Sequence, residues 1–122
     1  MDNKSNFSSN HVKGDVGETM AIEYLISKGY TLVCEKYRSK IGEIDCVVKD
    51  PDGTIVFVEV KSAKSMNCGN PLFRVTSAKQ KKIARVALQY LSEHKMLRIR
   101  CRFDVIGVVG EKIDHIRNAF YA

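Results

Sequence analysis

The polar and apolar positions of the chain first form a helical pattern, over residues 13–28. Apolar and small residues recur there at steps of three and four, as they do on one face of an amphipathic helix. Gly29 follows, where a glycine commonly ends a helix in the left-handed conformation. The expected inward face also carries one carboxylate, that of Glu18. Its members are Gly14, Glu18, Ala21, Ile22 and Leu25.

After this helix the pattern changes to the short apolar runs that are typical of β-strands. Strands are predicted over residues 30–37, 43–49 and 54–61, and a fourth, longer one over residues 97–109. Residues 62–75 show no clear period and contain asparagine, glycine and proline, which predicts a loop.

A second helix is predicted after this loop, from Ser77 to about His94. Ser77 and Gln80 lie three residues apart and form the signature of a capping box. A short final element over residues 113–122 is expected to pack Ile116 and Phe120. The order of helix, three strands, helix and strand predicts an α/β layer fold. The apolar face of the second helix consists of Ile83, Ala84, Ala87, Tyr90 and Leu91.

The second and third strands are predicted to form a β-hairpin. Residues 51–53 read Pro-Asp-Gly, which suits a three-residue loop closed by a left-handed glycine. If the residues on either side of this loop pair, Asp45 faces Glu59 and Glu43 faces Lys61. A slip of one residue would send Asp45 and Glu59 to opposite faces of the sheet.

The length and composition of the chain indicate one globular domain. Residues 1–12 are polar and rich in Ser and Asn, so we expect a disordered N-terminal segment followed by a single domain over residues 13–122. The hydrophobic share of 44% and the charged share of 28% are ordinary for a soluble protein. The sequence shows neither a signal peptide nor an apolar run of about 20 residues, which favours a cytoplasmic protein that does not span a membrane.

Charge and cysteine content narrow the possible partners only slightly. Twenty Lys and Arg residues against 14 Asp and Glu give a net charge of +6, which leans toward an anionic partner. The four cysteines include no C-x-x-C pair and the three histidines are scattered, so a zinc site is not favoured.

The pairing of Asp45 with Glu59 is costly unless something neutralises it. Two unit charges about 5 Å apart repel by about 3 kcal/mol at an effective dielectric constant of about 20. A divalent cation would remove this repulsion. Two alternatives need no metal: a wet hairpin face on which Lys61 neutralises one acid, or a buried ion pair between Glu18 and Lys61.

Magnesium chemistry would explain why these residue types occur together. Mg²⁺ takes hard oxygen ligands and keeps several waters, so Asp45, Glu59, the carbonyl of Val60 and Glu18, directly or through water, are the candidate ligands. Lys61 lies on the same strand face as Glu59 and could orient an attacking water. Gln80 could hydrogen-bond that water or the substrate, or could serve only as the capping partner of Ser77.

These residues resemble a known group of enzymes. Asp45 followed by Glu59-Val60-Lys61 resembles the PD-(D/E)XK nuclease signature, and Glu18 on a preceding helix is the extra acid of the Holliday-junction resolvase branch. Four motifs together are similar to those of the YraN family of uncharacterised, endonuclease-like bacterial proteins. They are Gly14-x-x-Gly17-Glu18-x-x-Ala21, Gly42-Glu43-Ile44-Asp45, Phe57-Val58-Glu59-Val60-Lys61 and Arg102-Phe103-Asp104-Val105-Ile106.

The resemblance implies a restriction-endonuclease-like αβββαβ core, with a central mixed sheet flanked by helices. It implies Asp45, Glu59 and Lys61 as the catalytic set, with Glu18 completing the acidic cluster and Mg²⁺ or Mn²⁺ as the cofactor. Glu43 would tune Lys61 or only flank it. The implied activity is hydrolysis of nucleic-acid phosphodiester bonds, with DNA as the expected substrate, and a resolvase-like homodimer is suggested by analogy.

Basic residues on the second helix, with Lys64 in the loop before it, are the best candidates for phosphate contacts. The set is Lys64, Lys79, Lys81, Lys82 and Arg85. Such contacts would position a nucleic acid without reading its sequence. The alternative is a solvated helix face. Arginines at positions 98, 100 and 102 alternate along the last strand and could instead protect a sheet edge from aggregation.

Two other classes of function remain open at this point. A nuclease-like module could bind branched or structured nucleic acid and cut it poorly or not at all. A small structural or partner-binding domain could instead pair its acids internally.

Overall fold

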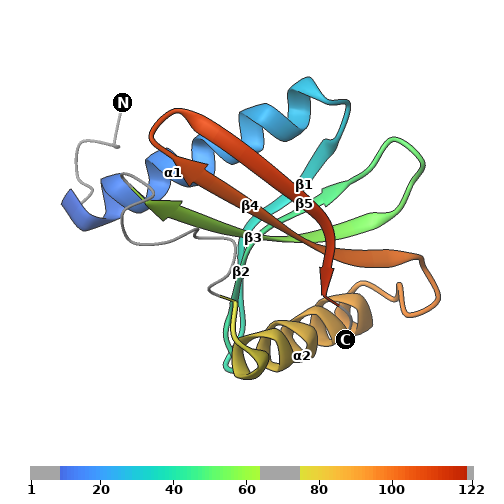
Figure 1. Ribbon diagram of the computed structural model, residues 1–122. Coiled ribbons are helices and arrows are strands. Elements are labelled where there is room, and N and C mark those ends of the chain that lie inside the picture. The colour runs from blue at the N-terminus through green and yellow to red at the C-terminus, as the bar shows by residue number, and fades with distance from the viewer. Residues whose placement is uncertain (1–8, 64–74, 121–122) are drawn as a thin grey trace, which may run out of the picture.

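The computed structural model describes residues 9–63 and 75–120, which form one mixed sheet with a helix on each side. The strands lie in the order β1-β2-β3-β4-β5, and only β3 and β4 are parallel neighbours (Figure 1). The elements are α1 (Ser9–Ser27), β1 (Thr31–Arg38), β2 (Glu43–Lys49), β3 (Ile55–Ala63), α2 (Ser77–Glu93), β4 (Cys101–Val109) and β5 (Lys112–Phe120). The predicted α/β class and αβββαβ order are confirmed, and β5 adds a fifth strand.

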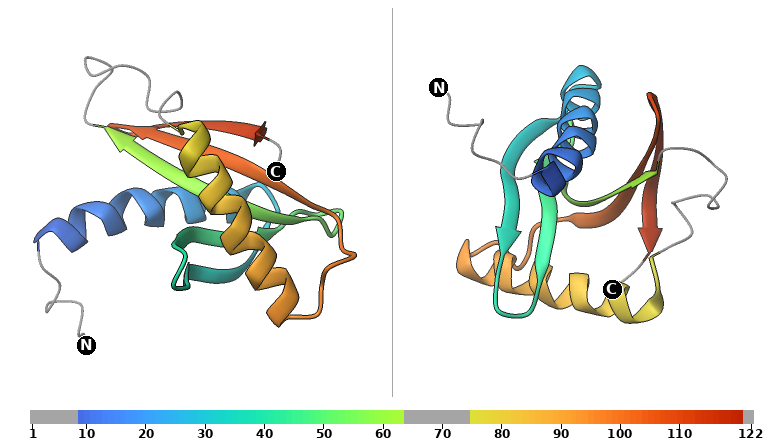
Figure 2. Two further views of the ribbon diagram at one scale, coloured as in Figure 1. Left: turned by 90° about the horizontal axis from the view of Figure 1, so that it is seen from below. Right: turned by 90° about the vertical axis from the view of Figure 1, so that its left-hand side faces the viewer.

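The two helices cover opposite faces of the sheet. In the right-hand view of Figure 2 the strands lie between α1 and α2. Buried side chains of the α1 layer include Ala21, Leu25, Val48, Val56, Val58 and Ile106. Those of the α2 layer include Val47, Phe57, Val86, Tyr90, Phe103 and Phe120. Because β2, β3 and β4 bury residues on both faces, their sequences are nearly continuous apolar runs.

Helix α1 begins earlier than the sequence predicted. It starts at Ser9 rather than near residue 13. Residues 1–8 lie outside the described part of the chain. The C-terminal signal is confirmed, because Gly29 follows the helix with a φ angle of 93°.

Helix α1 passes close to the end of β3. A Cβ atom on Gly17 would lie 2.6 Å from the hydroxyl oxygen of Ser62, so only a glycine allows this approach without a shift. Ala21 and Leu25 continue the same helical face and are fully buried. Glu18 is the next residue of the helix, and its side chain is half-buried.

The predicted hairpin and its register are confirmed. The backbone N–H of Asp50 donates to the carbonyl of Thr54 at 2.9 Å, and Gly53 has a φ angle of 96°. Val47 pairs with Phe57, as the predicted register requires. The paired residues of this ladder end at Cys46 and Val58, so Asp45 and Glu59 lie one position beyond it.

Helix α2 has a different N-cap from the one predicted. Thr76, not Ser77, is the N-cap: its backbone is extended and its hydroxyl accepts the N–H of Lys79 at 3.1 Å. Gln80 therefore forms no capping box with Ser77, and its side-chain amide donates to the carbonyl of Val75 at 3.0 Å. Both Thr and Ser can cap a helix, and the sequence did not distinguish them. Most of the predicted loop over 62–75 lies outside the described residues, although β3 extends to Ala63.

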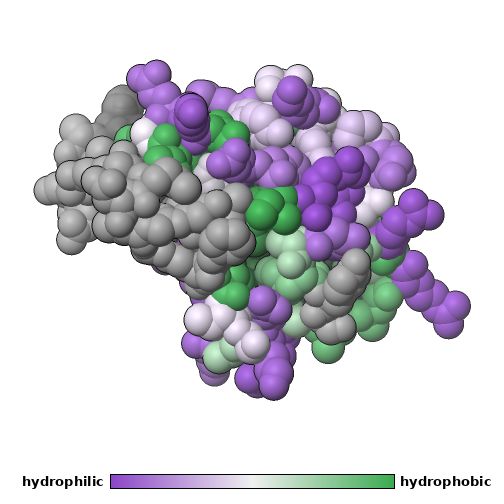
Figure 3. Space-filling model, viewed as in Figure 1, coloured by the Kyte–Doolittle hydropathy of each residue, from purple (hydrophilic) through white to green (hydrophobic). Residues whose placement is uncertain are grey.

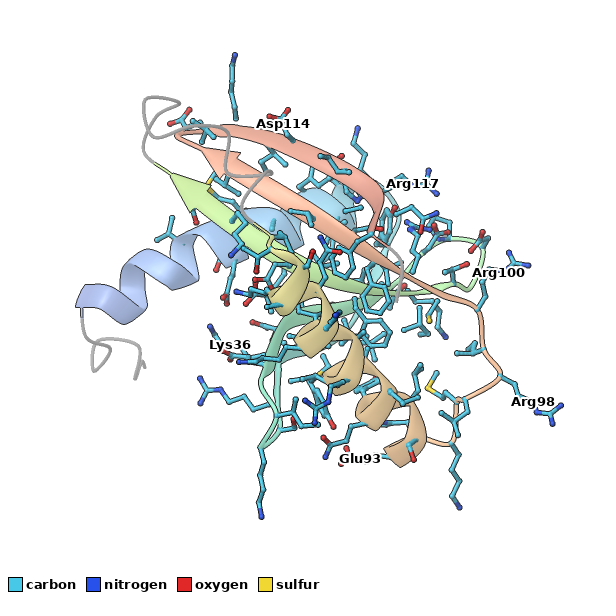
Figure 4. All side chains as sticks on the ribbon, turned by 60° about the horizontal axis from the view of Figure 1, so that its bottom comes forward. Lys36, Glu93, Arg98, Arg100, Asp114 and Arg117 are labelled. Carbon is cyan, nitrogen blue, oxygen red and sulfur yellow. The ribbon has the colours of Figure 1, made fainter. Side chains whose placement is uncertain are left out.

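The last predicted strand is shorter than expected and is not an edge. Strand β4 begins at Cys101, and Arg98 and Arg100 lie before it and project outward (Figure 4). Because β4 pairs with β3 on one side and β5 on the other, Arg102 does not protect an edge. The final element is strand β5, in which Phe120 is buried as predicted but Ile116 is 37% exposed.

In the view of Figure 3, green hydrophobic patches lie among purple hydrophilic residues over the part of the surface that is coloured. Neither helix, as far as its residues are described, is long and apolar enough to cross a bilayer.

Candidate active site

A pocket of about 480 Å³ lies between the first turns of α2 and the ends of β2 and β3. It brings together side chains from three elements that are far apart in the sequence. The lining residues include two acids of the predicted catalytic set and two of the predicted phosphate-binding lysines. They are Gly42, Glu43, Asp45, Glu59, Thr76, Ala78, Lys79, Lys82 and Ile83.

Asp45 is held in the pocket by the neighbouring strand. One of its carboxylate oxygens accepts the backbone N–H of Val60 at 2.7 Å. Burial raises the pKa of Asp45 to about 7, and the negative charge of Glu59 adds to this rise. Glu18 and Glu43 raise it further, whereas the Val60 hydrogen bond opposes the change. Burial and the neighbouring acids therefore favour the protonated form of Asp45.

Glu59 faces the same pocket and is neutralised by two lysines. Its side chain is 7% exposed, and one oxygen lies 2.8 Å from the Lys79 ammonium and 3.5 Å from that of Lys61. Burial lowers the pKa of Lys61, and the charge of Lys79 contributes to this lowering against the opposing effect of Glu59. The hydrogen bond to Glu59 raises the pKa of Lys79. Two acids and two lysines thus form one interacting cluster.

The two remaining acids have partners on β1 that the sequence did not indicate. Glu18 lies 2.7 Å from the ammonium of Lys36, so the expected alternative of a pair between Glu18 and Lys61 is wrong. Glu43 accepts the guanidinium N–H of Arg38 at 2.9 Å and does not pair with Lys61 as predicted. No periodic signal in the sequence pointed to β1 as a source of these cations.

The carboxylates of the pocket fit a divalent cation that needs only one or two protein ligands. Mg²⁺ commonly uses only one or two protein carboxylates and completes its shell with water and phosphate oxygens. Asp45 and Glu59 offer such a pair, and their mutual repulsion would be relieved by a cation. Within residues 9–63 and 75–120, no three His, Cys, Asp or Glu side chains are placed to hold a metal together. Direct ligation by Glu18 as a third acid is therefore not supported, and contact through water, like ligation by the carbonyl of Val60, remains a prediction.

The predicted phosphate-binding lysines fall into two groups. Lys79 and Lys82 lie one helical turn apart and line the pocket, whereas Lys81 and Arg85 are exposed beyond it. The stem of Lys82 packs against Gly42, where a Cβ atom would approach it to 3.1 Å. The remaining predicted contact, at position 64, lies outside the described residues.

A second polar cluster, buried near the turn of the β2–β3 hairpin, was not predicted as such. Asp104 is fully buried and accepts hydrogen bonds from Arg102 at 3.0 Å and from the backbone N–H of Asn118 at 3.0 Å. His115 lies 2.7 Å from the same carboxylate, and Arg102 also reaches Asp50 at 2.7 Å. These hydrogen bonds connect β4 and β5 to the hairpin turn. Among the described residues no buried side-chain nitrogen or oxygen lacks a partner, which is consistent with a structural role for this cluster.

One sequence signal could have revealed this second cluster. Arg102 and Asp104 lie two positions apart in an apolar strand, so they share one face of the sheet. Two buried charges on one face require partners. The partner of His115, by contrast, depends on the β4–β5 pairing and could not be found from spacing.

Comparison with known proteins gives consistent matches over nearly the whole chain. The model of the uncharacterised protein family UPF0102 matches residues 17–108. A UPF0102 protein of Clostridioides difficile is 45% identical over 114 residues, which cover 92% of this chain and 99% of that protein. Similar proteins of the same description occur in Desulfosudis oleivorans, with 44% identity and 89% of each chain covered, and in Trichlorobacter lovleyi, with 41% identity and 91% of each covered.

Proposed function

The chain belongs to the uncharacterised protein family UPF0102, the YraN-like family that its motifs indicated, and on this premise we propose that it is a metal-dependent endonuclease. The proposed reaction is hydrolysis of a nucleic-acid phosphodiester bond by an in-line water. One observation carries the proposal: Asp45 and Glu59, from paired strands, share a pocket with basic side chains. A carboxylate pair beside lysines is what a cation and a phosphate would require together.

Each residue has a role that its surroundings support. Asp45 and Glu59 would hold Mg²⁺ or Mn²⁺, with the Val60 N–H fixing the orientation of the Asp45 carboxylate. A bound cation of this kind polarises the scissile phosphodiester and lowers the pKa of a bound water. Lys61, whose pKa is lowered by burial, would orient the attacking water and stabilise the charge that develops on the phosphate.

The proposed partner is DNA, bound through its phosphates. Lys82 lines the pocket, and Lys81 and Arg85 extend the basic surface along α2. Removing the last two charges should weaken binding and reduce the slope of affinity against salt by about 1 to 2, because each lost phosphate contact reduces it by about 0.9. An unchanged slope would rule out this surface. A homodimer, measured by sedimentation, remains a further prediction.

The decisive experiment combines metal binding with cleavage. Calorimetric titration with Mn²⁺ should show binding to the wild type and none to Asp45→Ala. Labelled single-stranded, duplex and branched DNA should be cut in the presence of Mg²⁺, and Lys61→Ala should reduce the rate by roughly 100-fold or more, as expected when a group acting in the transition state is lost. Cleavage that survives in both Lys61→Ala and Glu59→Ala would come from a contaminant and would contradict the proposal.

One observation favours a second candidate, a nuclease-like module that binds structured DNA without cutting it. Glu59 already has a close ion pair with Lys79, so its charge is satisfied without a metal. This candidate predicts tight binding of branched DNA in EDTA and no cleavage with any divalent cation. The endonuclease proposal predicts cleavage with Mg²⁺ or Mn²⁺ and none in EDTA.

A further inference from the structure

Lys79 occupies a position in which two interactions compete. Its ammonium lies 2.8 Å from an oxygen of Glu59, a proposed metal ligand. The same side chain belongs to the first turn of α2 and lines the pocket that a phosphate would enter. Its side chain is 43% exposed, so the protein covers it only in part.

The divalent cation and the ammonium of Lys79 would compete for the carboxylate of Glu59. A carboxylate as buried as that of Glu59 needs a positive partner, and Lys79 is closer to it than Lys61 is. A divalent cation bound between Asp45 and Glu59 would supply that positive charge and repel the ammonium. Released from Glu59, Lys79 would remain beside Lys82, which lies one turn further along α2 and lines the same pocket.

We propose that Lys79 is an internal counter-ion that exchanges with the divalent cation, pairing with Glu59 in the metal-free protein and with a substrate phosphate once the cation is bound. This inference rests on the proposed endonuclease function and adds a mode of regulation to it. Binding of metal and binding of nucleic acid would be coupled through one side chain, so each would increase the affinity of the other. Lys79 acts here as a positioning and binding residue.

The first test measures metal affinity by calorimetric titration with Mn²⁺ alone. Lys79→Gln should bind Mn²⁺ about tenfold more tightly than the wild type, because the cation no longer displaces an ion pair. Lys79→Arg, which can keep the pair, should bind as the wild type does. Lys82→Gln is the matched control: it removes the same charge from the same pocket, but within the described residues Lys82 makes no ion pair. An equal gain in Lys82→Gln would show a general charge effect and overturn the exchange.

The second test measures the coupling with a fluorescein-labelled DNA duplex, by anisotropy in EDTA and in Ca²⁺. Ca²⁺ should increase the affinity of the wild type for the duplex by about tenfold, and this gain should largely disappear in Lys79→Gln. A gain of the same size in both proteins would overturn the exchange.

A third test uses the wild type and does not depend on the folding of a variant. Amine-reactive labelling followed by mass spectrometry should modify Lys79 faster when Mn²⁺ is present, because a free amine reacts more readily than one held by a carboxylate. Lys82 serves as the internal reference and should not change. Equal labelling of Lys79 with and without Mn²⁺ would contradict the exchange.

The outcomes separate this inference from the proposed function. If the wild type binds Mn²⁺ and cuts DNA but Lys79→Gln binds Mn²⁺ no more tightly, the exchange is wrong and the nuclease proposal stands. If the wild type and Asp45→Ala both fail to bind Mn²⁺, the metal premise is wrong and the exchange is overturned with it.

Discussion

Replacing Asp45 with asparagine should stabilise the protein at alkaline pH when divalent cations are removed. Burial and the charge of Glu59 raise the pKa of Asp45 from its usual 3.8 to about 7. The folded state therefore holds this proton more tightly than the unfolded state does. The free energy of unfolding is greatest while the carboxyl group is protonated, and it falls as the pH rises from about 4 to about 7.

The size of the effect follows from the two pKa values. One pKa unit corresponds to about 1.36 kcal/mol. Between pH 5 and pH 8 the wild type should lose about 2.5 kcal/mol of unfolding free energy through this group. Asp45→Asn removes that loss because an amide does not titrate, and its oxygen can still accept the Val60 N–H.

Urea denaturation at pH 5 and pH 8 in EDTA measures the difference. Asp114→Asn is a suitable control, since it neutralises an exposed carboxylate on β5, away from the pocket. We expect Asp45→Asn to gain stability relative to the wild type on going from pH 5 to pH 8, and Asp114→Asn to follow the wild type. If all three proteins show the same pH dependence, Asp45 is not the desolvated neighbour of Glu59 and the reasoning is wrong.

Three further predictions concern stability and can be measured by denaturation at neutral pH. Arg102→Met should cost about 3 kcal/mol, because it leaves the fully buried Asp104 without its cation, and a loss below about 1 kcal/mol would contradict this. Thr76→Ala should cost about 1 kcal/mol and Ser77→Ala almost nothing, whereas the reverse result would restore Ser77 as the N-cap. Phe57→Ala should cost about 3 to 5 kcal/mol through the cavity it leaves, and a near-neutral effect would mean that the core under α2 is not packed as described.

The part of the fold that depends on local sequence could be predicted. The hairpin register followed from a three-residue loop and the alternation of its strands, and Asp45 and Glu59 line one pocket just beyond the paired residues. The order of elements followed from the change of period along the chain. These features depend on neighbours in sequence, and the rules that govern them are short-range.

The partners of the acids could not be predicted, because they come from elements distant in sequence. Lys36 reaches Glu18 because β1 lies under α1, and Lys79 reaches Glu59 because α2 docks over the end of the hairpin. A spacing rule carries no information about such contacts. The choice between Thr76 and Ser77 as N-cap failed for another reason, since both have a hydroxyl and only the backbone angles decide.

The parallel pairing of β3 with β4 also has a consequence for the order of folding. The β2–β3 hairpin closes a three-residue loop and can form within microseconds. The β3–β4 pairing, which includes Ile55 with Cys101, joins residues far apart in the sequence and forms only after α2 has packed across the sheet. The nascent chain would therefore expose Asp45 and Glu59 before Lys79 of α2 arrives to pair with Glu59. Because the hairpin turn forms early, substitutions at Asp50 or Gly53 should slow refolding. Because α2 packs later, substitutions in α2 should mainly accelerate unfolding.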